Sequence, residues 1–142
     1  MATWANILIG CATASVVHEL GHFIAAWLLH VDIYRLAFFG GRPVFKWIFK
    51  GKDWPIIEIG WFPWGGYTYA PTVDLRKEYW IVLAGPLANF VISGTFLQYA
   101  GGTGLCATVG TVNIIMCISA MLPFGQKDGA RLVAIFKQFK KR

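Results

Sequence analysis

The sequence predicts a mainly α-helical membrane protein, with three transmembrane helices and a small antiparallel β-meander or hairpin between the first and the second. Composition is the first reason, because hydrophobic residues make up 56% of the 142-residue chain and charged residues only 14%. That balance is typical of integral membrane proteins. Long uncharged stretches are the second reason. The third is a segment of about fifty residues with strand-like alternation and turn signals. The length corresponds to a single domain, residues 1–142.

The first predicted span covers residues 4–29 and is long enough to cross a bilayer with some tilt. It has no basic start and is too long for a signal peptide, so we expect it to be retained. Its middle carries the residues HELGH at 18–22, whereas the flanking sequences WANILIGCATASVV and FIAAWLL have no charge. Because ionisable residues are costly at membrane depth, this cluster predicts a functional site.

The segment after the first span predicts a small antiparallel sheet of up to four strands. Strand-like alternation occurs in four places: 33–39, 43–49, 55–62 and 66–70. The turn signal Gly-Gly-Arg at 40–42 separates the first two segments, and Pro-Trp-Gly at 63–65 separates the last two. We expect the apolar tip at 61–64 to dip into the bilayer interface. A tip packed on the helices is the alternative.

The second span is predicted at 79–100 and the third at 105–136, with a break near 123–128. Pro123 lacks a backbone N–H, and two nearby glycines permit an irregular stretch. The resumed helix has a basic face opposite an apolar stripe of Leu132, Ile135, Phe136 and Phe139. The three cysteines lie in apolar segments without paired spacing, so we expect them to pack rather than to bind metal or form disulfides.

The distribution of Lys and Arg predicts the topology. Residues 30–78 contain seven of the 13 basic residues and the tail from Lys127 onward contains six, whereas the chain before Trp4 and the GGTG turn at 101–104 contain none. The positive-inside rule then places the N-terminus outside and the sheet and the C-terminus in the cytoplasm. The net charge of +6 is therefore a topology signal and does not predict binding to nucleic acid.

The HELGH segment has the spacing of a metal-binding helix. His18 and His22 lie four residues apart, so on a helix they share one face and can hold one ion. Glu19 lies beside them, where it could take a proton from a water that the metal activates. The alternative is a pair of histidines packed between helices and hydrogen-bonded to neighbours. That alternative leaves a glutamate in hydrocarbon unexplained.

Asp128 is the candidate for a third ligand, because a catalytic zinc site uses three protein ligands. Ten residues separate His22 from Asp32, the next charge, and nine separate Asp128 from Lys137. In helical geometry each ligand then lies about 13–15 Å from the cytoplasmic side, so the ligands can meet at one level. The alternative is that Asp128 caps a helix at the membrane surface, and both interpretations can hold together.

The middle span carries LAGPLANF at 83–90. Pro86 cannot donate to the carbonyl of Val82, so we expect the helix to bend there. Asn89 follows nearly one turn later and offers an uncharged amide that is able to hold a peptide backbone. The alternative is an asparagine that joins two helices by hydrogen bonds.

Together these segments resemble the site-2 protease family of intramembrane zinc metalloproteases, in the form of a minimal three-helix core. HELGH is similar to the family's HExxH, GPLAN to its G-P-x-x-N segment, PFGQKDG to its N-x-x-P-x-x-x-x-D-G segment and FPWGGYTY to its P-x-GGY segment. The resemblance implies Zn²⁺ held by His18, His22 and Asp128, with Glu19 as the catalytic acid and base. It implies substrate contacts from Asn89 and, in the hairpin, from Gly65, Gly66 and Tyr67.

The expected activity is hydrolysis of peptide bonds within or near transmembrane segments. The expected partners are a transmembrane protein substrate, the lipid bilayer, and a regulatory protein or a second copy of the chain. One departure is that Ala120 stands where the family has an asparagine. Gln126 or Asn113 could take over the role of that asparagine in holding substrate. A catalytically silent scaffold or accessory subunit with the same fold is therefore the main alternative. An intramembrane ion path and a membrane-surface binder acting through the basic tail are weaker ones.

Overall fold

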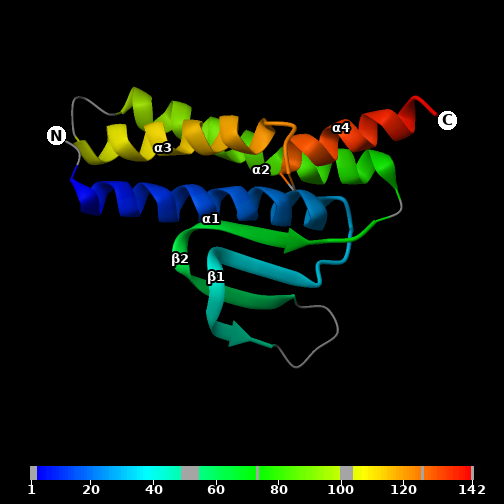
Figure 1. Ribbon diagram of the computed structural model, residues 1–142, viewed down its shortest axis with the longest axis horizontal. Coiled ribbons are helices and arrows are strands. Elements are labelled where there is room, and N and C mark those ends of the chain that lie inside the picture. The colour runs from blue at the N-terminus through cyan, green and yellow to red at the C-terminus, as the bar shows by residue number, and fades with distance from the viewer. Residues whose placement is uncertain (1–2, 49–54, 73, 100–103, 126, 142) are drawn as a thin grey trace.

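The computed structural model describes residues 3–48, 55–72, 74–99, 104–125 and 127–141. Three helices, α1 (Trp4–Leu28), α2 (Leu75–Gln98) and α3 (Gly104–Met121), are long and apolar enough to cross a membrane. They lie side by side, and a shorter helix, α4 (Asp128–Phe139), continues the layer of α2 and α3 (Figure 1). The strands β1 (Arg35–Trp47) and β2 (Ile56–Tyr69) form a sheet on the opposite side of α1. The predicted fold class is thus confirmed.

Polar caps account for where the first two spans begin. The side chain of Thr3 accepts a hydrogen bond from the backbone N–H of Asn6 at the start of α1. The side chain of Asp74 accepts from the backbone N–H groups of Arg76 and Lys77. This cap starts α2 at Leu75, four residues before the apolar run from which the span was predicted, because a cap satisfies N–H groups that the helix itself leaves unpaired.

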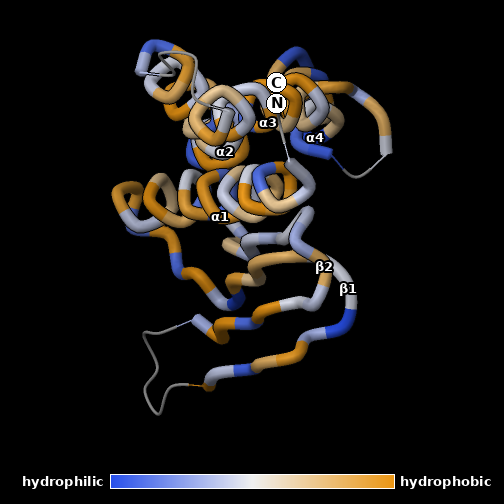
Figure 2. Tube along the Cα trace, turned by 90° about the vertical axis from the view of Figure 1, so that its left-hand side faces the viewer, coloured by the Kyte–Doolittle hydropathy of each residue, from blue (hydrophilic) through white to orange (hydrophobic). Residues whose placement is uncertain are grey.

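The outer surfaces of the helices are apolar. Hydrophobic residues occur on the outward turns of the helices as well as between them (Figure 2), and large exposed side chains include Ile24, Trp27 and Phe90. Exposed apolar surface over several helices is what a bilayer requires. Between the helices small residues permit close approach. A Cβ on Gly21 would overlap the carbonyl of Ala84 on α2.

The sheet consists of two strands that both bend. β1 bends at Phe39, which has a positive φ of 67°, and at the adjoining glycines. Leu36 pairs with both Ile57 and Thr68, whereas Ile57 pairs with both Leu36 and Trp47. The segments therefore lie in the order 43–47, 56–60, 35–38 and 66–69, with the last one next to α1 (Figure 1). Residues 35–38 run antiparallel to 66–69 but parallel to 56–59, a parallel pairing that was not predicted.

The side chains of the apolar tip of the sheet, residues 61–64, lie in two different environments. Trp61 and Phe62 are exposed, with relative exposures of 66% and 49%. Trp64 instead packs against the buried cluster of Ala14, Val112 and Met116 on α1 and α3. The expected contact with the bilayer interface thus remains a prediction for Trp61 and Phe62. Trp64 packs on the helices, which was the alternative expected for the tip.

Candidate metal centre

The site is built on α1, where His18 and His22 occupy the same face one turn apart. Both histidines and the adjacent Glu19 are buried, with 5%, 7% and 3% of each residue exposed. Their Nε2 atoms lie 3.2 Å apart. Buried ionisable groups need partners, and those partners come from α2, α4 and β2.

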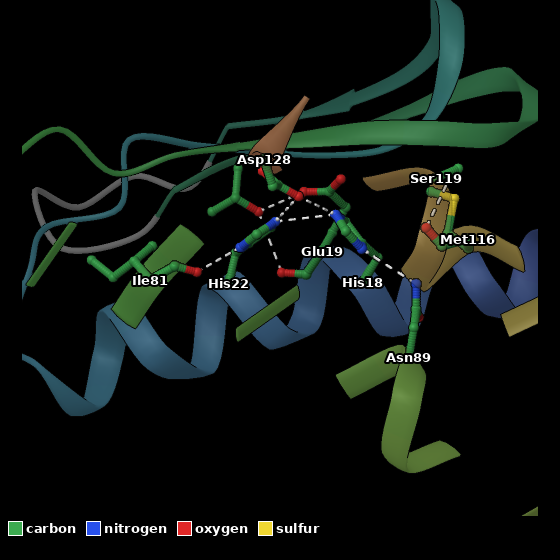
Figure 3. Close-up of polar contacts among 9 residues, drawn as sticks. His18, Glu19, His22, Ile81, Asn89, Met116, Ser119 and Asp128 are labelled. Atoms are coloured by element: carbon green, nitrogen blue, oxygen red, sulfur yellow. Dashed lines mark hydrogen bonds and ion pairs between the residues drawn. The ribbon is translucent and has the colours of Figure 1, made fainter. Parts of the chain in front are cut away.

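Asp128, the first residue of α4, completes the cluster (Figure 3). Its Oδ2 atom lies 2.9 Å from Nε2 of His18 and 3.4 Å from Nε2 of His22. Two ligands held about 2.0–2.1 Å from a tetrahedral ion lie about 3.3 Å from each other. Two of the separations match that value and the third, 2.9 Å between His18 and Asp128, is somewhat shorter. Two imidazoles with one carboxylate are a donor set that suits Zn²⁺. The residues present therefore fit a zinc ion.

The chain between α3 and α4 brings Asp128 back to α1. Gly125 has a φ of +68°, a conformation that favours glycine. Gly129 lies against the backbone of Met121, where a Cβ would overlap the carbonyl oxygen. Lys127, rather than Asp128, occupies the N-cap position of α4. The carboxylate of Asp128 is thus directed to the histidines and does not cap the helix (Figure 3).

Glu19 faces the last segment of β2. Its Oε2 atom accepts a hydrogen bond of 2.8 Å from the hydroxyl of Thr68. Gly66 lies so close that a Cβ there would overlap the Glu19 side chain. Ser15, one turn earlier on α1, donates to the carbonyl of Gly65. These contacts hold the glutamate between α1 and the strand that covers it.

Helix α2 supports both histidines from behind. The Nδ1 atom of His22 lies 2.7 Å from the carbonyl oxygen of Ile81. The Nδ1 atom of His18 lies 3.3 Å from the side-chain nitrogen of Asn89 (Figure 3). Gly85 lies under the ring of His22, where a Cβ would overlap it. The glycine of the GPLAN segment therefore makes room for a histidine.

A cavity of about 280 Å³ opens onto the cluster. It is lined by the two histidines, Glu19 and Asp128, by residues 64–68 of β2, by the end of α3 and by Lys127 and Arg131. Gly65, Gly66 and Tyr67, which the family resemblance implied as substrate contacts, line this cavity, and so does Ala120. Asn89 is fully buried behind His18 and is not among the lining residues. Gln126 lies outside the described residues.

A second polar cluster lies within the sheet next to the cavity. Glu58 is 4% exposed, and its Oε2 atom accepts from Nε of Arg35 at 2.8 Å and from the hydroxyl of Tyr67 at 3.3 Å. Burial alone would raise the pKa of Glu58, but the hydrogen bond and positive charge of Arg35 outweigh it and hold the pKa below its ordinary value. Burial and the neighbouring Glu58 charge raise the pKa of Tyr67. The pair Arg35 and Glu58 thus anchors a residue of the cavity wall.

Sequence reasoning missed three of these contacts. Thr68 could have been found, because it lies two residues after Gly66 and therefore faces the same side of the strand. The carbonyl of Ile81 carried no signal, since every residue has one. The pairing of Arg35 with Glu58 depends on the parallel run between 35–38 and 56–59, which local patterns do not reveal.

Comparison with known proteins identifies the family. Residues 6–102 match the family model of Peptidase family M50. The chain belongs to this family. The match covers more than half of the chain, and the resemblance to site-2 proteases is confirmed. Together with the three apolar helices, membership makes the chain a multi-pass integral membrane protein of a metalloprotease family.

Two individual proteins are similar to it. A Ralstonia nicotianae protein with a provisional assignment as a zinc metalloprotease is 29% identical over 119 residues, covering 66% of this chain and 25% of the relative. The site-2 protease of Methanocaldococcus jannaschii has a similar fold, with a TM-score of 0.67 and 24% identity, covering 97% of this chain and 57% of that one. The chain thus spans about a quarter of the length of the first relative and just over half of the second.

Proposed function

We propose that this chain is an intramembrane zinc metalloendopeptidase that hydrolyses peptide bonds within or near transmembrane segments of membrane proteins. The observation that carries the proposal is the convergence of three ligand atoms, from His18, His22 and Asp128, within 4.8 Å of one another at a cavity that also contains Glu19. A zinc ion held there would supply Lewis-acid polarisation of the substrate carbonyl and lower the pKa of a water.

Glu19 is the proposed acid and base. Its carboxylate lines the same cavity as the three ligands, and one of its oxygens is held by Thr68. That hydrogen bond leaves the other oxygen to take a proton from the attacking water and to pass it to the leaving amine. Thr68 orients Glu19 without being a reacting group itself.

The cavity wall suits an extended peptide. A helical segment hides its carbonyls in hydrogen bonds, so a transmembrane substrate must unwind before it can be cut. Residues 64–68 form the part of β2 that lines the cavity, and Gly65 has no atom within 4 Å of where a Cβ would lie. An extended substrate could pair with this segment and regain its lost backbone hydrogen bonds.

The proposed orientation follows from the basic residues. Arg35, Arg42 and Lys46 lie on β1, and Lys137, Lys140 and Lys141 lie at or beyond the end of α4. The positive-inside rule then places the sheet and the C-terminus in the cytoplasm and the N-terminus outside. Reporter tags at the two termini, probed by protease in sealed cells, test the orientation.

The decisive experiment compares Glu19→Gln with the unchanged chain. Both are reconstituted in liposomes with a panel of single-span reporter proteins, and zinc content and cleavage are measured in the same samples. We expect normal zinc binding and a loss of cleavage of at least about 100-fold, since general acid–base catalysis contributes about 10²–10⁴-fold. Undiminished cleavage by Glu19→Gln would contradict the mechanism.

A silent scaffold is the second candidate. Ala120 lines the cavity where the family's segment has an asparagine, so an amide that could hold substrate is replaced by a methyl group. A scaffold predicts no cleavage of any reporter by the unchanged chain and no effect of Glu19→Gln on the cellular phenotype. Restoring the amide with Ala120→Asn provides the matched gain-of-function control.

A further inference from the structure

In each candidate histidine ligand the outer nitrogen is Nδ1, which faces away from the cluster. The partner of Nδ1 shows which ring nitrogen carries the hydrogen. Nδ1 of His22 lies 2.7 Å from the carbonyl oxygen of Ile81. A carbonyl can only accept, so Nδ1 carries the hydrogen and Nε2 keeps its lone pair. His22 thus presents to the cluster the nitrogen that can bind a metal ion.

His18 is placed differently. Its Nδ1 lies 3.3 Å from Nδ2 of Asn89. An amide nitrogen can only donate, so this contact requires the tautomer with the hydrogen on Nε2. Yet Nε2 of His18 is the atom that converges with His22 and Asp128, and a protonated Nε2 cannot bind a metal ion. The contact and the ligand role therefore exclude each other in this amide orientation.

The other half of the same amide has no partner. Asn89 is 0% exposed, and its Oδ1 atom is buried without a hydrogen bond. An unpaired buried polar atom is unfavourable, because it has given up its hydrogen bonds to water without replacing them. A 180° rotation of the carboxamide exchanges Oδ1 and Nδ2 and keeps the shape of the side chain. It would bring Oδ1 to Nδ1 of His18, which must carry a hydrogen when Nε2 binds zinc.

We propose that Asn89 is a positioning residue for the metal centre, whose Oδ1 accepts a hydrogen bond from Nδ1–H of His18 and so fixes the ligand tautomer. The assignment rests on the proposed zinc site. It gives α2 one role for both histidines, because Ile81 and Asn89 each accept from an Nδ1–H group. Outer hydrogen bonds of this kind orient metal-binding histidines and raise their basicity.

This role differs from the two roles that the sequence allowed. A substrate contact requires Asn89 to reach the cavity, whereas its side chain lies behind the ring of His18 (Figure 3) and the residue does not line the cavity. A purely helix-joining role requires only packing and a hydrogen bond between α1 and α2. That role predicts a loss of stability without a selective loss of zinc affinity.

The chain offers a matched control in Asn113 on α3. Asn113 is also 0% exposed and its Oδ1 is also buried without a partner, but its Nδ2 donates to the carbonyl of Val109 in the same helix. Asn113→Leu therefore removes a buried amide of the same kind away from the two histidines. Asn89→Leu removes the proposed acceptor, and Asn89→Asp keeps an acceptor while removing the donor.

The experiment measures the zinc affinity of each detergent-purified full chain by competition with a chelator, beside thermal unfolding. We expect Asn89→Leu to weaken zinc binding about 10–100-fold, while Asn89→Asp and Asn113→Leu stay within about threefold of the unchanged chain. Nitrogen-15 NMR of the imidazole rings in the unchanged, zinc-loaded chain needs no variant, and should show the hydrogen of His18 on Nδ1.

Equal zinc affinity of Asn89→Leu and the unchanged chain would overturn the assignment and leave the zinc site standing. Equally weak binding by Asn89→Leu and Asn89→Asp would overturn it too, because an acceptor would then not suffice. An NMR spectrum with no hydrogen on Nδ1 of His18 has the same meaning. A folded, unchanged chain that binds no zinc would overturn the proposed function and this assignment with it.

Discussion

The two walls of the candidate centre differ in how closely they are packed. On the wall formed by α1 and α2, Gly21 and Gly85 leave no room for a Cβ, and the outer nitrogens of His18 and His22 both contact α2. On the wall formed by β2 and the start of α4, Gly66 and Gly129 also leave no room for a Cβ, but the space beside Gly65 is open and Lys127 is exposed. The closed wall can fix the two histidine ligands, whereas the open wall supplies Asp128 and can admit a substrate. The geometry of the two histidines and the access of substrate are thus served by different elements.

Filling the closed wall should have the largest effect. Gly85→Ala puts a methyl group into the ring of His22, so we expect zinc affinity to fall by at least about 100-fold, the upper end for changes around a metal ligand. Gly94→Ala, on the same helix with nothing within 4 Å, should leave zinc affinity unchanged and raise stability by about 0.5–1 kcal/mol. Chelator competition and thermal unfolding measure both. Equal effects of the two variants would contradict the comparison.

Changing the part of the open wall that β2 forms should affect catalysis and spare the metal. Thr68→Val removes the hydroxyl that donates to Glu19 and keeps the shape of the side chain. We expect kcat on a reporter substrate to fall about 10-fold with zinc affinity unchanged, because the base loses its orientation. Thr95→Val, which removes a hydroxyl bonded within α2, is the control. A loss of zinc in Thr68→Val would show that the two walls are not independent.

The cluster of Arg35, Glu58 and Tyr67 in the sheet should make the stability of the chain depend on pH. The pKa of Glu58 in the folded chain lies below its ordinary value of 4.5. Its contribution to stability is therefore complete above that value and is lost as the pH falls through the lowered pKa. Thermal unfolding of the unchanged chain should show this loss, and Glu58→Gln should be less sensitive to acid over the same range. An identical pH dependence of thermal unfolding in the two chains would contradict this contribution of Glu58 to stability.

Arg35→Ala should have a smaller effect. It leaves Glu58 buried without its closest partner, which costs about 1–3 kcal/mol. Because the Arg35 side chain is 41% exposed, solvent screening favours the lower half of that range. Zinc affinity should not change, since the cluster acts through Tyr67 on the open wall. Thermal unfolding and chelator competition on the same sample test this expectation.

The smallest effect is expected where an exposed ion pair joins α4 to α2. The guanidinium of Arg131 lies 3.4 Å from the carboxylate of Glu78, and the two side chains are 48% and 29% exposed. Exposed pairs of this kind contribute about 0–1 kcal/mol. Glu78→Gln should therefore shift thermal unfolding by no more than about 1 kcal/mol and leave zinc affinity unchanged. A large loss of stability or of zinc affinity would mean that this pair holds α4 in place.

The sequence predicted the three helices and the HELGH face because these depend on local periodicity and apolar length. It also indicated Asp128, because a break after Pro123 and a lone acid near the membrane are visible in the chain itself. The bent strands, with 35–38 between 56–59 and 66–69, were not predictable, since alternation fixes faces but not partners. The position of Asn89 behind His18 depends on how α2 packs on α1, and a helix pattern leaves that rotation open.

The most direct test of the account is the metal content of the detergent-purified chain beside His22→Ala and Asp128→Ala. The account predicts about one zinc per chain, lost in both variants, because all three ligand atoms lie within 4.8 Å of one another and a catalytic zinc site uses three protein ligands. Zinc that is lost in His22→Ala but kept in Asp128→Ala would contradict the proposed ligand set. A folded chain that binds no zinc after it is added back would contradict the metal centre itself.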